Sequence, residues 1–250
     1  LNSHASVSAR SFSVEETRRY AGGIDDPARL VSAFAGVSVG NVQDNAIIVR
    51  GNSPKGVSWR LEGVEIPTPH HFVGGNVAGG GMVTLFSSQM LANSDFHTSA
   101  FPAEYGNALA GVFDMNLRNG NFDKREHTFQ AGTMGLDFSS EGPLSAGSNA
   151  SYVFNYRYST LGLLADLKAI PDEQVIKYQD LSYKFNIPTK RAGTFSIWGI
   201  GGLDVSTEAL ETDSTLWETD WDRVTYDWDI ATGAAGVSHR FYTGDRTFFH

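Results

Sequence analysis

Four phrases within residues 46–121 decide the fold: Ile-Ile-Val-Arg-Gly at 47–51, Leu-Glu-Gly-Val-Glu-Ile at 61–66, Phe-Pro-Ala-Glu-Tyr-Gly at 101–106 and Gly-Val-Phe-Asp-Met-Asn-Leu-Arg-Asn-Gly at 111–120. Alternation at 46–50 and 57–64 predicts two strands, and the turn-forming residues between them predict a hairpin. Glycines and prolines make 67–81 a loop. Residues 82–91 fit a strand or a helix equally, and 111–117 alternates as a strand. The stretch predicts a small α+β domain with a short sheet.

Upstream, the sequence predicts an extended lead-in followed by two short helices. Residues 1–12 are small and polar without periodicity. Ser13 and Glu16 have the spacing of a capping box and predict the start of the first helix. Asp26 followed by Pro27 predicts the start of the second, whose apolar residues share one face and which ends near Gly36.

Downstream, the chain alternates between apolar and polar residues in long runs. In 149–159 the aromatic residues share one face and the polar residues the other, with Val153 as the exception, and 180–187 and 223–230 repeat the pattern. We expect strands at 126–133, 136–142, 148–159, 179–188, 192–205, 222–241 and from 246 onward. Such strands suit a transmembrane barrel with aromatic girdles, or a soluble β-sandwich in which one face of each sheet is exposed to solvent. After the first tight turn, short and long connections alternate, which favours the barrel.

Composition narrows the classes of function. The net charge of −9 and the lack of a Lys/Arg cluster argue against a nucleic-acid partner. Without cysteine the chain has no disulfide, thiolate metal site or cysteine nucleophile. No apolar run is long enough for a membrane-spanning helix, although transmembrane strands do not need one. About seven strands cannot enclose a domain of this size, so we expect the sequence to be a segment of a longer protein.

The four phrases, in their order, resemble the plug domain of TonB-dependent outer-membrane receptors. The resemblance implies a lead-in at 1–12, a plug domain at 13–121 and, at 122–250, the first seven or so strands of a transmembrane antiparallel β-barrel of the 22-stranded type. Phe-Pro-Ala-Glu-Tyr-Gly-Asn-Ala at 101–108 and Tyr-Arg-Tyr-Ser at 156–159 are similar to receptors of Bacteroidetes.

The resemblance also implies a function in the outer membrane. A nutrient, such as a metal chelate, glycan, peptide or other small molecule, would bind outside the cell. The inner-membrane TonB complex would then rearrange the plug by pulling on a TonB box, which we expect upstream of this chain. Residues 39–44 lack the Ser-Gly-x-Pro-Gly segment of SusC glycan importers, which makes a SusD-type lipoprotein doubtful. Glu104 stands where many plugs carry arginine.

Several residues are candidates for binding rather than for catalysis. By resemblance, Arg50 occupies the position of a plug arginine that pairs with barrel glutamates; the alternative is a solvated arginine at a strand end. The loop 67–81 aligns with the plug apex that faces the substrate, or else it packs on the barrel wall. The substrate-binding candidates are Thr68, His70, His71 and Phe72, with a second possible apex at Asn41, Gln43 and Asp44.

No cofactor, metal site or catalytic residue is predicted. Adjacent histidines on an extended chain point to opposite faces, so His70 and His71 do not make a metal site. Residues 51–56 match neither a nucleophile elbow nor a phosphate-binding loop. A glycan-active enzyme would need two carboxylates facing each other across a cleft. The main alternative to transport is therefore a secreted or surface β-rich binding or adhesion protein, which a closed sandwich over 126–250 would favour.

Overall fold

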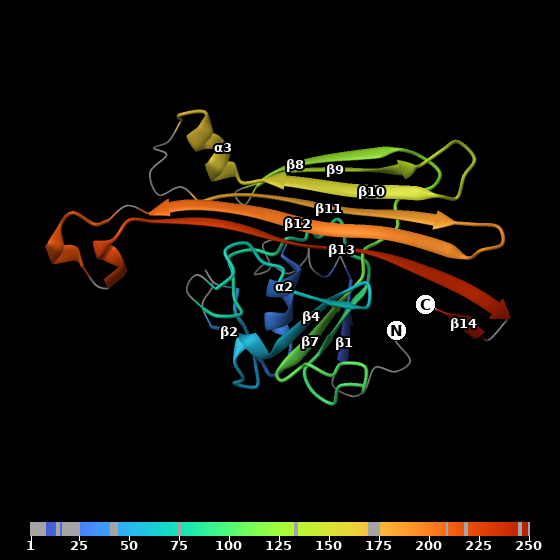
Figure 1. Ribbon diagram of the computed structural model, residues 1–250, viewed down its shortest axis with the longest axis horizontal. Coiled ribbons are helices and arrows are strands. Elements are labelled where there is room, and N and C mark those ends of the chain that lie inside the picture. Colours follow the sequence, from blue (N-terminus) through green and yellow to red (C-terminus); the bar gives the residue numbers. More distant parts are fainter. Residues whose placement is uncertain are drawn as a thin grey trace.

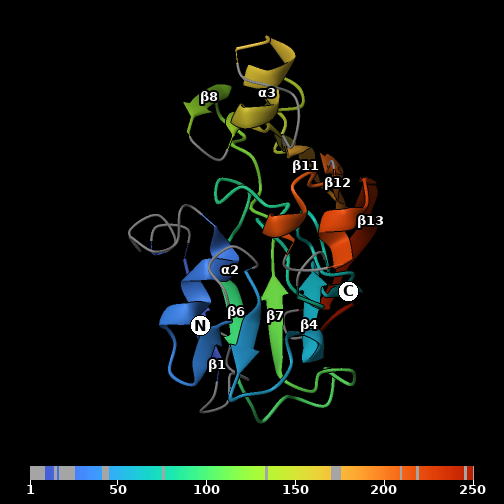
Figure 2. The same cartoon turned by 90° about the vertical axis from the view of Figure 1, so that its left-hand side faces the viewer.

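The computed structural model describes residues 9–13, 16, 26–40, 45–74, 77–132, 135–169, 176–208, 210–217, 220–244 and 247–249. A small N-terminal domain, ending near Asn121, packs against one face of a long antiparallel sheet (Figure 1). Seen from the end that carries α3, the short strands of the N-terminal domain lie below the long sheet (Figure 2).

The N-terminal domain is built on a five-stranded sheet. Its order is β1 (Ala9–Phe12), β6 (Ser94–His97), β7 (Gly111–Met115), β4 (Val57–Leu61) and β5 (Val64–Ile66), and the pairing of β4 with β7 is parallel. A separate pair joins β2 (Val37–Val39) to β3 (Ile47–Val49). The ring of Phe113 lies 4.8 Å from Trp59 and 5.3 Å from Phe96, at the centre of an apolar core.

The predicted hairpin between residues 46–50 and 57–64 is wrong. Strand β3 pairs with β2 instead, and the true hairpin joins β4 to β5. Its turn is Glu62-Gly63, with φ values of 52° and 81°. Two successive left-handed residues are what a tight two-residue hairpin requires, and a non-glycine residue at the first position hid the turn within an apparently continuous strand.

Both helix starts follow the sequence. Ser13 and Glu16 form the reciprocal capping hydrogen bonds, at 2.9 and 3.3 Å, although the rest of the first predicted helix lies outside the described residues. Asp26 caps α2 (Pro27–Leu30), which continues as η1 (Val31–Ala33). Residues 82–91 form neither a strand nor a helix but an irregular segment with isolated bridges. Another short helix, η2 (Pro54–Gly56), precedes β4.

The long sheet contains all seven predicted strands in sequence order. They are β8 (Glu126–Ala131), β9 (Leu136–Pro143), β10 (Ser151–Tyr158), β11 (Lys177–Pro188), β12 (Thr194–Glu208), β13 (Tyr226–Gly244) and β14 (Thr247–Phe249). The two long connections also carry the helices α3 (Thr160–Asp166), η3 (Ser214–Leu216) and η4 (Asp220–Arg223), which the sequence did not predict. The strands form one open sheet rather than a sandwich.

The two faces of the long sheet differ as the alternation predicted. Asp180, Ser182 and Lys184 are buried and contact the N-terminal domain, whereas Leu181 between them is 44% exposed on the opposite face. Val153, the exception in the pattern of β10, belongs to the apolar core. Among the described residues no helix has the length and hydropathy to cross a membrane.

Candidate functional site: the charged contact between the N-terminal domain and the long sheet

His71 forms the centre of the contact between the two parts of the chain. Its imidazole is fully buried between two carboxylates on neighbouring strands, Asp180 of β11 and Asp204 of β12. The Nε2 atom lies 2.9 Å from Asp180 Oδ2, and Nδ1 makes a close hydrogen bond with Asp204 Oδ1. The backbone N–H of Phe72 donates to Asp204 Oδ2 at 2.8 Å. His71 of the loop is thus hydrogen-bonded to two neighbouring strands of the sheet.

Arg157 of β10 extends this contact toward helix α2. Its Nε donates to Asp180 at 2.8 Å, and its guanidinium also donates to the carbonyl of Thr84. The backbone N–H of Thr84 donates to Asp26 at 3.0 Å, and Asp26 caps α2. A continuous hydrogen-bonded path therefore runs from the helix cap through the loop to the sheet.

The adjacent histidines differ in charge state. Burial lowers the pKa of His70 from 6.5 to about 4, so its ring is neutral at physiological pH. That ring packs edge-on against Trp59 at 5.0 Å, and neither nitrogen has a partner among the described residues. Burial also lowers the pKa of His71, but its hydrogen bonds to the carboxylates of Asp180 and Asp204 and their negative charges outweigh burial, and the net shift is upward. His71 is therefore the more basic member of the pair.

A second group of ion pairs lies nearer the end of the sheet at which β11 and β12 are joined by a short link. Lys184 Nζ donates to Glu62 Oε1 and to the carbonyl of Leu117, both at 2.8 Å. Arg118 makes a two-pronged contact with Glu141 at 2.7 and 2.8 Å, a geometry that suits guanidinium and carboxylate. The N-terminal domain is therefore fastened to the sheet by charged groups at two separate places.

The predicted binding residues have different surroundings. His70 and His71 are fully buried, whereas Thr68 and Phe72 are partly exposed. His71 contacts the long sheet. This contact corresponds to the second prediction for the loop, in which it packs on the barrel wall. A ligand-facing role for the four residues stays a prediction. Asn41, Gln43 and Asp44 lie outside the described residues.

Arg50 is exposed, with a φ of 51°, and makes no ion pair with the described part of the chain, so its pairing with a barrel glutamate also stays a prediction. The contacts that do join the domain to the sheet come from residues that the sequence did not single out. These are Glu62, Arg118, Glu141, Arg157, Asp180, Lys184 and Asp204. In the long sheet, the sequence showed such residues only as charged residues on the polar face of an alternating strand. That pattern predicts which face of the sheet they lie on, but not which residue they contact.

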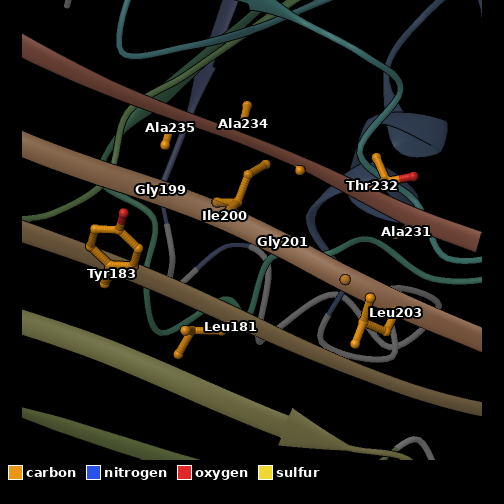
Figure 3. Close-up of a pocket in the computed structure, with 12 residues that line it drawn as sticks. Leu181, Tyr183, Gly199, Ile200, Gly201, Leu203, Ala231, Thr232, Ala234 and Ala235 are labelled. Carbon is orange, nitrogen blue, oxygen red and sulfur yellow. The ribbon is translucent and has the colours of Figure 1, made fainter.

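Two hollows adjoin the sheet. One, of about 410 Å³, lies along β11 to β13, where glycines and alanines leave room beside Tyr183 and Leu181 (Figure 3). The other, of about 260 Å³, is polar and lies beside the Lys184–Glu62 pair, with Arg240 in its lining. In the described part of the chain, no three His, Asp or Glu side chains group as metal ligands.

Comparisons with family models and with curated protein sequences give no match. Solved structures do match. The ferric yersiniabactin uptake receptor FyuA of Yersinia pestis has a TM-score of 0.61 at 12% identity, over 95% of this chain and 38% of that one. The FrpB iron transporter of Neisseria meningitidis has a TM-score of 0.59 at 10% identity, over 95% and 39%. The chain has the fold of the matched part of these structures.

FpvA of Pseudomonas aeruginosa, solved with a bound pyoverdine–iron complex, gives a TM-score of 0.58 at 13% identity, over 95% of this chain and 32% of that one. The chain thus spans between about a third and two fifths of the length of the receptors that it matches. These structures are receptors and transporters of the outer membrane, which agrees with the localisation that the sequence predicts. The shared fold supports the predicted resemblance to TonB-dependent receptors.

Proposed function

We propose that this protein is an outer-membrane active-transport receptor that binds a nutrient outside the cell and imports it when the TonB complex rearranges its N-terminal domain. In this proposal residues 13–121 are the plug and residues 122–250 are strands of a larger barrel. The observation that carries it is the contact itself. A folded domain is held against a sheet of long strands by buried ion pairs and hydrogen bonds.

The outward face of the sheet supports placement in a membrane. Leu181, Leu203 and Val237 are 44%, 49% and 71% exposed, and neighbouring outward residues are also apolar. Strands β12 and β13 contain 15 and 19 residues, more than the roughly 9–11 that a tilted strand needs to cross the hydrocarbon core. A secreted adhesion protein, the alternative, would leave this apolar face in water at a cost of about 25 cal/mol per Å².

The connections suggest how the sheet is oriented. The links at 159–176 and 209–225 are long and leave the same end, whereas those at 189–193 and 245–246 are short and leave the other. Long loops belong outside the cell in barrels of this kind. Asp180 and Asp204 lie near the long-loop ends of their strands, so the loop that carries His71 would lie in the outer half.

Partners and substrate follow from the proposed class. The TonB complex of the inner membrane would supply the energy, and outer-membrane lipid would cover the apolar face. FyuA, FrpB and FpvA are named for iron or ferric siderophores, so iron chelates are the first substrates to test, followed by vitamins, glycans and peptides. An origin in Bacteroidetes and the lack of a SusD-type lipoprotein stay predictions from the sequence.

A reversible cross-link tests the proposal directly. These 250 residues contain no cysteine, so within them two added thiols can pair only with each other. A Cβ at Gly202 would lie 2.4 Å from Leu85 Cδ2 and 2.9 Å from His71 Cε1, so positions 85 and 202 are neighbours across the contact and are the pair to replace with cysteines. We expect the oxidised Leu85→Cys/Gly202→Cys variant to remain in the outer membrane and bind its nutrient but to stop importing it.

The reduced form of the same variant is the matched control, because it carries the same local strain. Reduction should restore uptake, measured with radiolabelled iron chelates and the other candidate nutrients. If the oxidised and reduced forms import every nutrient equally well, the N-terminal domain does not move during transport. If a deletion strain shows no uptake defect for any candidate and the protein fractionates as a secreted species, the adhesion alternative holds.

A further inference from the structure

The hydrogen bonds of His71 determine how many protons its ring carries. Nε2 faces a carboxylate oxygen of Asp180, and Nδ1 faces a carboxylate oxygen of Asp204. An ionised carboxylate only accepts hydrogen bonds. Both ring nitrogens must therefore donate, and an imidazole that donates from both nitrogens is the protonated, cationic form.

The charges around His71 balance only in that form. Asp180 and Asp204 bring two negative charges into a site from which solvent is excluded, and Arg157 brings one positive charge. A protonated His71 makes the group neutral. A neutral His71 would leave one buried negative charge and would turn a nitrogen lone pair toward a carboxylate, and both are unfavourable in a low-dielectric interior.

The other titratable groups around the ring do not replace that charge. Tyr178 of β11 packs 4.4 Å from the ring, and its hydroxyl has no partner among the described residues. His70 is neutral, and the guanidinium of Arg29, which lies near His70 together with Asp26, donates to the carbonyl of Met82. Asp137 of β9 and Asp26 lie near Arg157, but the two carboxylates that hydrogen-bond to the imidazole in the described part of the chain are those of Asp180 and Asp204, so the proton on His71 is the one that balances them directly.

We propose that His71 is a proton-binding site that couples the position of the loop to proton uptake, with one proton bound as the loop docks on β11 and β12 and one released as it leaves. The docked imidazolium loses both carboxylates when the loop moves away, and at a pH above the ordinary pKa of 6.5 the proton then passes to water. The role of this proton in import rests on the proposed function, whereas its effect on docking does not.

The direction of the pH effect follows from the raised pKa of His71 in the docked state. Docking is fully stabilised below the ordinary pKa of 6.5 and weakens as pH rises through the docked value. Between those two values the docking equilibrium should fall by up to about tenfold per pH unit, the limit for one proton.

Hydrogen exchange on the purified full-length protein in detergent tests this coupling. The amide of Phe72 reports docking directly, because it donates to Asp204 Oδ2 of β12 at 2.8 Å. The amides of His71, Met82 and Leu85, which bond within the loop at 2.8–2.9 Å, report whether the loop keeps its docked conformation. We expect their protection factors, corrected for intrinsic exchange, to fall as pH rises from 6 to 9. The amide of Glu62, bonded to Met115 within the N-terminal domain, should change little.

Variants separate the proton from the fold. His71→Gln should lower protection at pH 6 and remove the pH dependence, and His71→Lys should keep protection without pH dependence, because lysine stays charged across this range. His70→Gln, equally buried but without carboxylate partners, is the matched control and should keep the wild-type pH dependence. Protection that is independent of pH in the wild type, or an unchanged pH dependence in His71→Gln, would overturn the proposal.

The outcome can be separated from that of the transport proposal. Failure of uptake at every pH, with pH-dependent protection intact, would count against the proposed function and leave the proton site in place. Normal uptake with pH-independent protection would count against the proton site and leave the proposed function in place.

Discussion

The ion pair between Lys184 and Glu62 gives a quantitative test of how the N-terminal domain is held. At 2.8 Å and an effective dielectric of about 20, the gross attraction is about 6 kcal/mol, and desolvation offsets most of it. Removing one partner leaves the other buried and unpaired, which typically costs about 3–5 kcal/mol. The two side chains are 9% and 10% exposed, so we take the lower end.

We predict that Lys184→Met destabilises docking by about 3 kcal/mol and that Glu62→Gln, which keeps a hydrogen-bonding oxygen for the Leu117 N–H, costs about 2 kcal/mol. The double variant should cost about 3 kcal/mol rather than the sum of both, giving a coupling energy of about 2 kcal/mol. The measurement is urea-dependent hydrogen exchange of the amides of Leu117 and Arg118, which lie beside the pair and donate to Glu62 and to the carbonyl of Met90, fitted for the free energy of opening.

An exposed ion pair provides the matched control. Lys124 and Glu126 approach to 2.7 Å but are 69% and 43% exposed, so Lys124→Met should leave the exchange rates unchanged. The reasoning is refuted if the effects of Lys184→Met and Glu62→Gln simply add, or if Lys124→Met costs as much as Lys184→Met. Either result would mean that the buried position of the pair does not strengthen it.

Three further predictions follow from single contacts. Asp26→Ala should destabilise the N-terminal domain by about 3 kcal/mol in chemical denaturation, because buried donors that now bond to its carboxylate lose their acceptor. Gly120→Ala should abolish assembly into membranes, since a Cβ there would lie 1.9 Å from the carbonyl oxygen of Tyr152, whereas Gly106→Ala, with open space around it, should assemble normally. Burial raises the pKa of Asp114, so the neutral form is favoured, and Asp114→Asn should melt higher than wild type near pH 7, with the difference vanishing below about pH 4.

The long sheet was largely predictable because alternation is a local property. Each strand shows on its own which residues share a face, and Leu181 and Ser182 lie on opposite faces as expected. Sequential antiparallel strands with short links then leave little choice of neighbour. The capping residues Ser13 and Asp26 were equally readable, since an N-cap acts within one helical turn.

Partners that are distant in sequence were not predictable. Strand β3 pairs with β2 rather than with β4, and the Glu62-Gly63 turn is visible only once the backbone is traced. His71 meets Asp180 and Asp204 across 109 and 133 residues. Alternation places those carboxylates on the inner face, but which loop residue lies opposite depends on how a whole domain packs.

The contact between the N-terminal domain and the long sheet is made by charged residues, although apolar residues could also have filled it. Apolar side chains of similar volume often stabilise a buried site as well as an ion pair does, so His71, Arg157 and Lys184 are not needed for stability alone. What an ion pair adds is a contact whose strength changes when a charge is removed or water enters. Under the proposed function, the N-terminal domain stays closed until it is pulled away from the sheet, and contacts of that kind suit such a role. A single proton on His71 would then set how firmly the outer half of the domain is held, while the Lys184–Glu62 pair holds the other half.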